Sequence, residues 1–169
     1  LSSDRGCLKS RLQLANMYRL GKGTTCDVSE AVRLLKQIVD PLVDDSQGYR
    51  DMNLIDSSLE TLRDIYLEIG DNAEALKCCK EGADLGSDEC QFATGCMYEG
   101  LDPRYEFSRT DSDIFVGTPL EGDGIEIDFC AAAEYYQLAS ANEFHQGTIH
   151  LARMYEDGLG VEQSFSEAE

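Results

Sequence analysis

The stretch LARMYEDGLGV, from Leu151 to Val161, contains features that recur three times upstream in the same order. A tyrosine after Met or Ile marks each copy, and we count positions from this anchor: Tyr18, Tyr66, Tyr98 and Tyr155. The residue eight positions before the anchor is small in all four copies: Ser10, Ser58, Cys90 and Gly147. The residue three positions before it is small in three copies, with Arg63 as the exception: Ala15, Gly95 and Ala152. Apolar residues at helical spacing surround these positions, so each copy is predicted to begin with a helix that is buried on more than one side.

A second helix is predicted after each anchor. The first and fourth copies place glycines, which end helices in left-handed conformation, at matching positions: Gly21, Gly23, Gly158 and Gly160. Capping residues with an acid three residues later then start a new helix: Asp27 with Glu30, Asp71 with Glu74, and Ser164 with Glu167. Asp128 caps the third copy, and a small residue follows each cap by four positions: Ala31, Ala75, Ala132 and Ala168. Further along, the pair Gly82 and Ala83 is suited to close packing. Each copy therefore reads as helix, turn, helix.

These shared positions resemble the Sel-1-like repeat family, a relative of the tetratricopeptide repeats, with the pattern A-x3-LG-x-MY-x2-G-x-GV followed by D-x3-A-x2-WY-x2-AA-x2-G. The fourth copy matches the first half of the pattern best, and the second copy matches the second half through Ala75, Gly82 and Ala83. Departures are Arg63 in a small position, an early cap after Tyr66 and two insertions. The resemblance implies an all-α fold, a right-handed α/α solenoid superhelix of helical hairpins.

We expect one repeat array over residues 1–169, with hairpins at about 8–40, 57–86, 87–142 and 144–169, the last incomplete. Pro41 ends the second helix of the first hairpin. The linker 41–56 is either a short helical turn packed on the stack or a flexible joint. Because the chain does not begin with Met and stops within a repeat, it is expected to be a piece of a longer solenoid.

The third copy carries an insertion at residues 102–127, because Tyr98 and its cap Asp128 are 30 residues apart where the first and fourth copies use nine. From Asp102 to Asp128, both included, there are eight acids and two bases, with prolines and glycines that forbid a continuous helix. Insertions in solenoids emerge on one face, often the binding face. The segment is either a disordered solvated loop or a docking segment whose contact residues would include three aromatic side chains: Tyr105, Phe107 and Phe115.

The net charge of −19 restricts the partners. Binding to nucleic acid or to an anionic membrane needs clustered Lys and Arg, and no such stripe is present, so neither partner is expected. The sequence has no apolar run long enough to span a membrane and no apolar core of a signal peptide near its start. The acidic residues either form a soluble surface without specific meaning or create an electrostatic field that attracts a basic protein segment.

Seven cysteines in an odd count, with no C-x-x-C pair, predict free, buried, reduced thiols and a cytoplasmic setting. A secreted or luminal protein would instead require disulfides. His145 and His150 lie about 140° apart on a helix, so they do not share a face for a metal. Since the chain contains no catalytic or phosphate-binding motif, we expect no enzyme activity, no cofactor and no metal site.

The predicted function is a protein-protein interaction scaffold, of the kind used in signalling and other adaptors, that binds a peptide or protein on a concave helical wall. The alternative is a regulatory or substrate-docking region of a larger enzyme or complex, of the kinase or ubiquitin-ligase type. The candidate wall residues are polar and lie two positions before the anchor: Asn16, Asp64 and Arg153. Packing between repeats is the other interpretation of these three residues. The unfinished last repeat predicts self-association.

Overall fold

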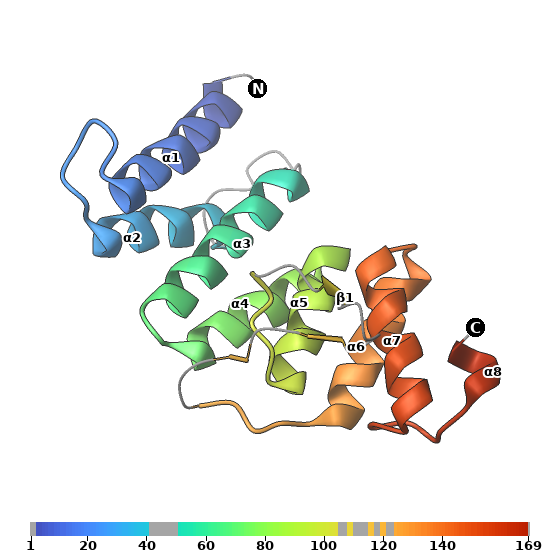
Figure 1. Cartoon of the computed structure of the whole chain (residues 1–169). Coiled ribbons are helices and arrows are strands. Elements are labelled where there is room, and N and C mark those ends of the chain that lie inside the picture. Colours follow the sequence, from blue (N-terminus) through green and yellow to red (C-terminus); the bar gives the residue numbers. More distant parts are fainter. Residues whose placement is uncertain are drawn as a thin grey trace. The chain divides into compact units, whose positions relative to one another are not determined.

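A computed structural model describes residues 3–40, 51–104, 108–109, 115–116, 119–120 and 124–168, with backbone only for residues 3–7 and for the two short strands. The chain divides into two compact units, Leu1–Ile69 and Gly70–Glu169, which are described separately (Figure 1). The division falls inside the range predicted as the second hairpin, so the hairpin at 57–86 stays a prediction, as does a single array over residues 1–169.

Unit 1 consists of three helices: α1 (Ser3–Leu20), α2 (Val28–Val39) and α3 (Met52–Glu68). Both α1 and α3 pack against α2, and they also contact each other. α1 begins five residues before its expected start, and α3 begins inside the predicted linker because Leu54 and Ile55 are buried. The end of the linker thus belongs to α3, while residues 41–50 lie outside the described residues, so the choice between a packed helical turn and a flexible joint stays a prediction.

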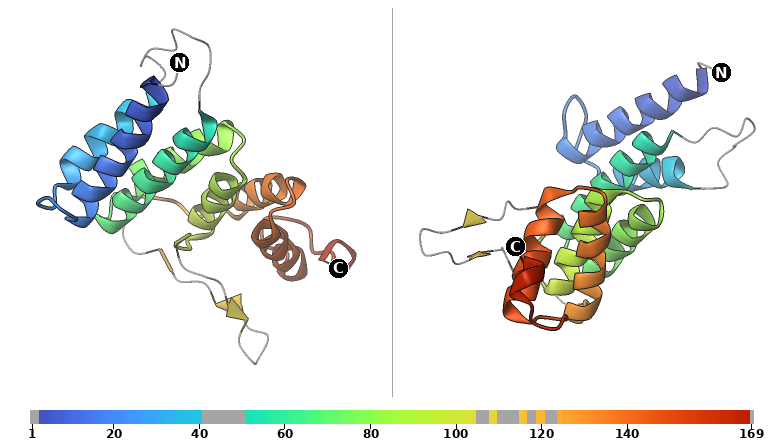
Figure 2. Two further views of the ribbon diagram at one scale, coloured as in Figure 1. Left: turned by 90° about the horizontal axis from the view of Figure 1, so that it is seen from above. Right: turned by 90° about the vertical axis from the view of Figure 1, so that its right-hand side faces the viewer.

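Unit 2 consists of α4 (Asn72–Asp84), α5 (Asp88–Glu99), α6 (Phe129–Ala141), α7 (His145–Asp157) and α8 (Phe165–Ala168), and each helix packs on the next. Two two-residue strands, β1 (Ser108–Arg109) and β2 (Phe115–Val116), pair antiparallel within the insertion (Figure 2). The all-α fold class is confirmed, with this short pairing as a local exception.

Three of the four predicted capping residues cap the helices that follow them. Asp27, Asp71 and Asp128 each accept a hydrogen bond from the backbone N–H three residues later, at 3.0, 3.2 and 3.0 Å. Ser164 directly precedes α8, where its hydroxyl lies 3.1 Å from that of Ser166. The glycines after the first anchor are left-handed as predicted, with φ of +64° at Gly21 and +78° at Gly23.

In the first, third and fourth copies, the turn closes on the anchor tyrosine. The amides of Asp27 and Ser164, nine residues beyond their anchors, donate to the carbonyls of Tyr18 and Tyr155 at 3.0 Å. The amide of Asp128 donates to the carbonyl of Tyr98 at 2.9 Å, although 30 residues separate the two. The insertion therefore leaves and rejoins the hairpin without changing the geometry of the turn.

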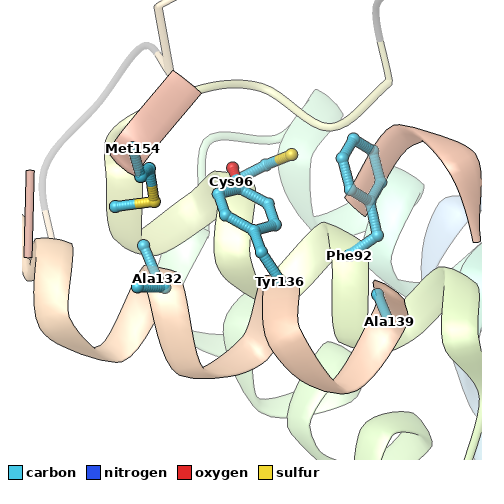
Figure 3. Close-up of a cluster of buried hydrophobic side chains, with 7 residues drawn as sticks. Phe92, Cys96, Ala132, Tyr136, Ala139 and Met154 are labelled. Atoms are coloured by element: carbon cyan, nitrogen blue, oxygen red, sulfur yellow. The ribbon is translucent and has the colours of Figure 1, made fainter. Parts of the chain in front are cut away.

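The small positions bring helices close together, as predicted. A Cβ on Gly95 would lie 2.6 Å from the Tyr136 ring, and one on Gly147 would lie 2.8 Å from the Cβ of Ala139. Figure 3 shows Tyr136 within the buried cluster that these helices share. Arg63, the exception in this series, is buried and pairs with its neighbour Asp64 on the same helix at 3.0 Å.

The cysteine prediction is correct for some residues and wrong for others. Cys78, Cys79, Cys90 and Cys96 are free and buried. Cys26 and Cys130 are free but exposed, contrary to the expected burial. Both lie at the entrance to a second helix, Cys26 one residue before a cap and Cys130 two residues after one. The side chain of Cys7 lies outside the described residues.

Candidate functional site

Two of the three predicted wall residues lie in ion pairs between neighbouring first helices. In unit 1, Asp64 of α3 lies 3.8 Å from the guanidinium of Arg19 on α1. In unit 2, Arg153 of α7 forms an ion pair with Glu99 of α5. Asn16, the third residue, is half-buried on α1.

The two ion pairs occupy equivalent positions with reversed charges. Arg19 and Glu99 each follow their anchor by one residue, and Asp64 and Arg153 each precede the next anchor by two. We call this contact the clamp. The base is on the earlier helix in unit 1 and on the later helix in unit 2. Each clamp joins two copies of the repeat, so it serves packing between repeats in both units.

The clamp in unit 2 is part of a buried polar group, the Glu99 cluster, which comprises Glu99, Tyr136, His150 and Arg153. The Glu99 carboxylate is only 6% exposed, accepts a hydrogen bond from the Tyr136 hydroxyl at 2.7 Å and lies 3.3 Å from Nδ1 of His150. The His150 ring packs against Tyr136 and, edge-on, against Phe92. An acid buried in this way needs such partners, because an unpaired buried charge is strongly destabilising.

Burial sets the protonation states in the Glu99 cluster. It lowers the pKa of His150 from 6.5 to about 4, so the imidazole is neutral at pH 7. Burial also raises the pKa of the Tyr136 hydroxyl well above 10, which keeps that hydroxyl as a donor to Glu99. Arg153 therefore carries the positive charge that balances Glu99. The positive and negative charges therefore cancel within the cluster, which has the properties of a structural element.

Unit 1 has an open groove at the first helices instead. The α1–α3 groove has a volume of about 350 Å³. Its apolar lining consists of Leu12 and Leu54. Its polar lining offers one cation, one carboxylate, two carboxamides and a hydroxyl: Lys9, Asp51, Gln13, Asn53 and Ser57. Small-molecule sites are lined mostly by apolar side chains, so this groove is more polar than that class, and its volume is at the lower end of it.

In unit 2, aromatic side chains occupy the corresponding region. Leu12 lies six positions before its anchor, and Phe92 holds the same position in the third copy. The Phe92 ring packs against Phe144 at 5.4 Å and Tyr136 at 5.8 Å between centroids. The first helices of unit 2 are therefore joined by rings where those of unit 1 leave a groove.

The proposed contacts in the insertion fall mostly beyond what the structure describes. Tyr105 and Phe107 lie outside the described residues, and Phe115 lies in β2, of which only the backbone is described. The base of the insertion is well defined: Leu101 bridges to Pro119, the amide of Leu120 donates to the carbonyl of Gly100 at 2.9 Å, and Asp102 pairs with Arg104 at 2.6 Å.

Sequence reasoning missed Glu99 and the residues that line the groove. Glu99 could have been found from a charge pattern. The residue one position after an anchor and the residue two positions before the next anchor have opposite charges, both in Glu99 and Arg153 and in Arg19 and Asp64. The groove leaves no comparable signal in the sequence, because it depends on how far apart α1 and α3 lie.

In the described part of the chain, no three His, Cys, Asp or Glu side chains gather as metal ligands would, and no helix there has the length and hydrophobicity to cross a membrane.

Comparison with known proteins agrees with this geometry. The Sel1 repeat model matches residues 9–39, 67–87, 119–144 and 146–169, more than half of the chain. No curated protein matches the sequence.

Two solved structures are similar. A Sel1 repeat protein from Oxalobacter formigenes has a TM-score of 0.56 and 20% identity, covering 98% of this chain and 39% of that one. The protective antigen c5321 of uropathogenic Escherichia coli strains, which displays an SLR fold, has a TM-score of 0.51 and 21% identity, covering 98% and 37%. The chain spans about two fifths of the length of each, and at these identities the likeness concerns the fold. From the repeat matches, we conclude that the chain belongs to the Sel1 repeat family.

Proposed function

We propose that this protein is an interaction scaffold that binds a peptide or protein segment along its first helices, with the α1–α3 groove as the contact site. Sel1 repeats are generally non-catalytic scaffolds for protein interaction. The observation that carries the proposal is the groove itself, about 350 Å³ between two helices of unit 1. A preformed groove favours binding because the ordering cost falls mainly on the ligand.

The lining of the groove suits an extended peptide. The carboxamides of Gln13 and Asn53 can each donate and accept, which matches the alternating N–H and C=O groups of a peptide backbone. Leu12 and Leu54 offer an apolar surface for one side chain of the ligand. Lys9 and Asp51 balance in charge, so the preference for a basic partner would come from the net charge of −19, mainly through faster association.

A groove-filling variant tests this proposal. Peptides selected from a random displayed library on the whole chain are measured against Ser57→Trp, which places a large ring in the groove at an exposed position. Ser29→Trp, at an exposed position on α2, is the matched control. We expect at least a tenfold loss of affinity for Ser57→Trp and no loss for Ser29→Trp. Equal affinity for both variants, or no enriched peptide at all, would reject the groove as the site.

The insertion is a second proposed contact, and its fixed base at Leu101 and Pro119 supports this role. Replacing Tyr105, Phe107 and Phe115 by Ser distinguishes binding at the insertion from binding at the groove. A peptide that binds the groove keeps its affinity, and one that binds the insertion loses it.

Self-association through the last repeat also stays a proposal, supported by exposed Ile149 and Phe165. Light scattering over a range of concentrations measures it.

A further inference from the structure

Two charged side chains line one end of the α1–α3 groove, one on each wall. Lys9 lies on α1 three residues before Leu12, and Asp51 directly precedes α3, three residues before Leu54. The two helices run in the same direction (Figure 1), so both charges lie on the amino-terminal side of the leucines. The groove therefore has an apolar part at Leu12 and Leu54 and a charged end at Lys9 and Asp51.

The Asp51 carboxylate does not cap the helix that it precedes. The side chains at the same position before α2, α4, α5 and α6 each accept a hydrogen bond from the amide three residues later, and that of Asp51 does not. Its backbone carbonyl holds the first turn of α3 by accepting from the amides of Leu54 and Ile55, at 3.0 and 3.1 Å. The carboxylate lines the groove instead.

Lys9 and Asp51 do not pair with each other across the groove. In the part of the chain that the structure describes, neither side chain forms an ion pair or a hydrogen bond. Other charges of unit 1 do pair: Arg19 with Asp64 and Glu68, Arg33 with Glu30, and Arg63 with Asp64. The charged end of the groove thus offers one ammonium and one carboxylate that a ligand can meet.

Unit 1 as a whole is close to electrically neutral. It contains 11 acids and 9 bases, whereas unit 2 contains 22 acids and 5 bases, so most of the net charge of −19 belongs to unit 2. The net charge of unit 1 therefore gives a bound peptide little preference for either sign of charge. Selection by charge at the groove has to come from side chains that touch the peptide, and the two charged ones there are Lys9 and Asp51.

We propose that the groove selects a peptide with a basic and an acidic residue next to each other, beside the apolar residue that packs on Leu12 and Leu54. Adjacent side chains of an extended peptide point to opposite sides. The base can therefore reach Asp51 on one wall while its acidic neighbour reaches Lys9 on the other. A purely basic segment is disfavoured, because its second base would face the like charge of Lys9. This inference rests on the proposed function, since it names the class of peptide that the groove takes.

The test uses peptides selected from the random displayed library on the whole chain. Those bound at the groove are identified by their loss of affinity in Ser57→Trp, and we expect them to share the adjacent base and acid. In one such peptide the base is replaced by Gln, and both peptides are measured against the original protein and Asp51→Asn, which keeps a residue suited to a helix start. Each single change should weaken binding about fivefold, and the two together should cost little more than one alone.

The same cycle is measured for the acid of the peptide and Lys9→Gln. Lys22→Gln, at an exposed position in the turn after α1, does not line the groove and should leave the affinity unchanged. Groove-bound peptides without the adjacent base and acid, or additive effects in either cycle, would overturn this inference and leave the groove as a peptide site. If no selected peptide is sensitive to Ser57→Trp, the groove itself is rejected and this inference with it.

Discussion

Both units contain a first helix, a second helix and the next first helix in this order: α1, α2 and α3 in unit 1, and α5, α6 and α7 in unit 2. The first helices of the two units meet differently. In unit 1 the clamp of Arg19 and Asp64 is partly exposed, and a groove lies between α1 and α3. In unit 2 the clamp of Glu99 and Arg153 belongs to a buried cluster, and aromatic rings pack beside it. One repeat pattern therefore supports both an open and a closed surface.

The two units also differ in side-chain size at equivalent positions. Three residues before the anchor and eight after the cap, unit 1 has Ala15 and Leu35, whereas unit 2 has Gly95 and Tyr136. The larger ring of Tyr136 fits only because Gly95 has no Cβ, and its hydroxyl then reaches Glu99. At this contact a larger side chain on one helix is matched by a smaller one on the other, whereas the charges of the clamp are reversed between the two units.

Removing the buried carboxylate should have the largest effect on this comparison. Glu99→Ala leaves the charge of Arg153 and the Tyr136 hydroxyl without their partner inside unit 2. We expect it to lower the free energy of unfolding by about 3–5 kcal/mol, the usual result of breaking a buried pair. Urea denaturation measures the loss, and hydrogen exchange should place it in α5 and α7.

Arg19→Ala is the matched change at the same position of unit 1. Its partners Asp64 and Glu68 are more exposed, and water replaces the lost contact. The expected cost is below about 1 kcal/mol. Similar costs for Glu99→Ala and Arg19→Ala would mean that the two clamps do not differ as their burial indicates.

Acid should destabilise unit 2 through His150, and both histidines of the chain lie in that unit. The pKa of His150 is about 4 in the folded protein and 6.5 without burial, so the unfolded state binds its proton more readily. The stability is therefore intact above pH 6.5 and is lost as the pH falls toward 4. The difference in pKa corresponds to about 3 kcal/mol.

The measurement compares urea denaturation at pH 7 and pH 4.5. His150→Gln removes the titrating group, while the carboxylates common to both proteins contribute equally to their acid response. We expect the variant to lose less stability on acidification than the original protein. His145→Gln, at an exposed position, should keep the full pH dependence. If the two variants respond to acid alike, burial of His150 is not the cause.

Adding a methyl group at Gly95 should have a smaller effect than removing the Glu99 carboxylate or protonating His150. Gly95→Ala places a Cβ 2.6 Å from the Tyr136 ring, and the overpacking should cost about 1–3 kcal/mol in thermal or urea unfolding. The double variant with Tyr136→Leu reproduces the pair found in unit 1. Its cost should be less than the sum of the two single costs. Strict additivity would show that the two positions do not share a volume.

Many elements were predictable because they depend on residues close together in the chain. Asp27, Asp71 and Asp128 cap helices through an amide three residues away, and Gly21 and Gly23 allow the turn by their own backbone freedom. Arg153 was singled out by its position, but its partner Glu99 is 54 residues away, and only packing brings the two together. The exposure of Cys26 and Cys130 likewise depends on which helix covers them.

The sequence by itself determined that this chain forms helical hairpins of the Sel1 type, because caps, turn glycines and small packing positions act locally and recur in register. Only the tertiary structure decided that α1 and α3 leave a groove while Phe92, Tyr136 and Glu99 close the corresponding region between α5 and α7. The physical reason is that the space between two helices depends on the combined volume of side chains from several helices. No single copy of the repeat contains that information.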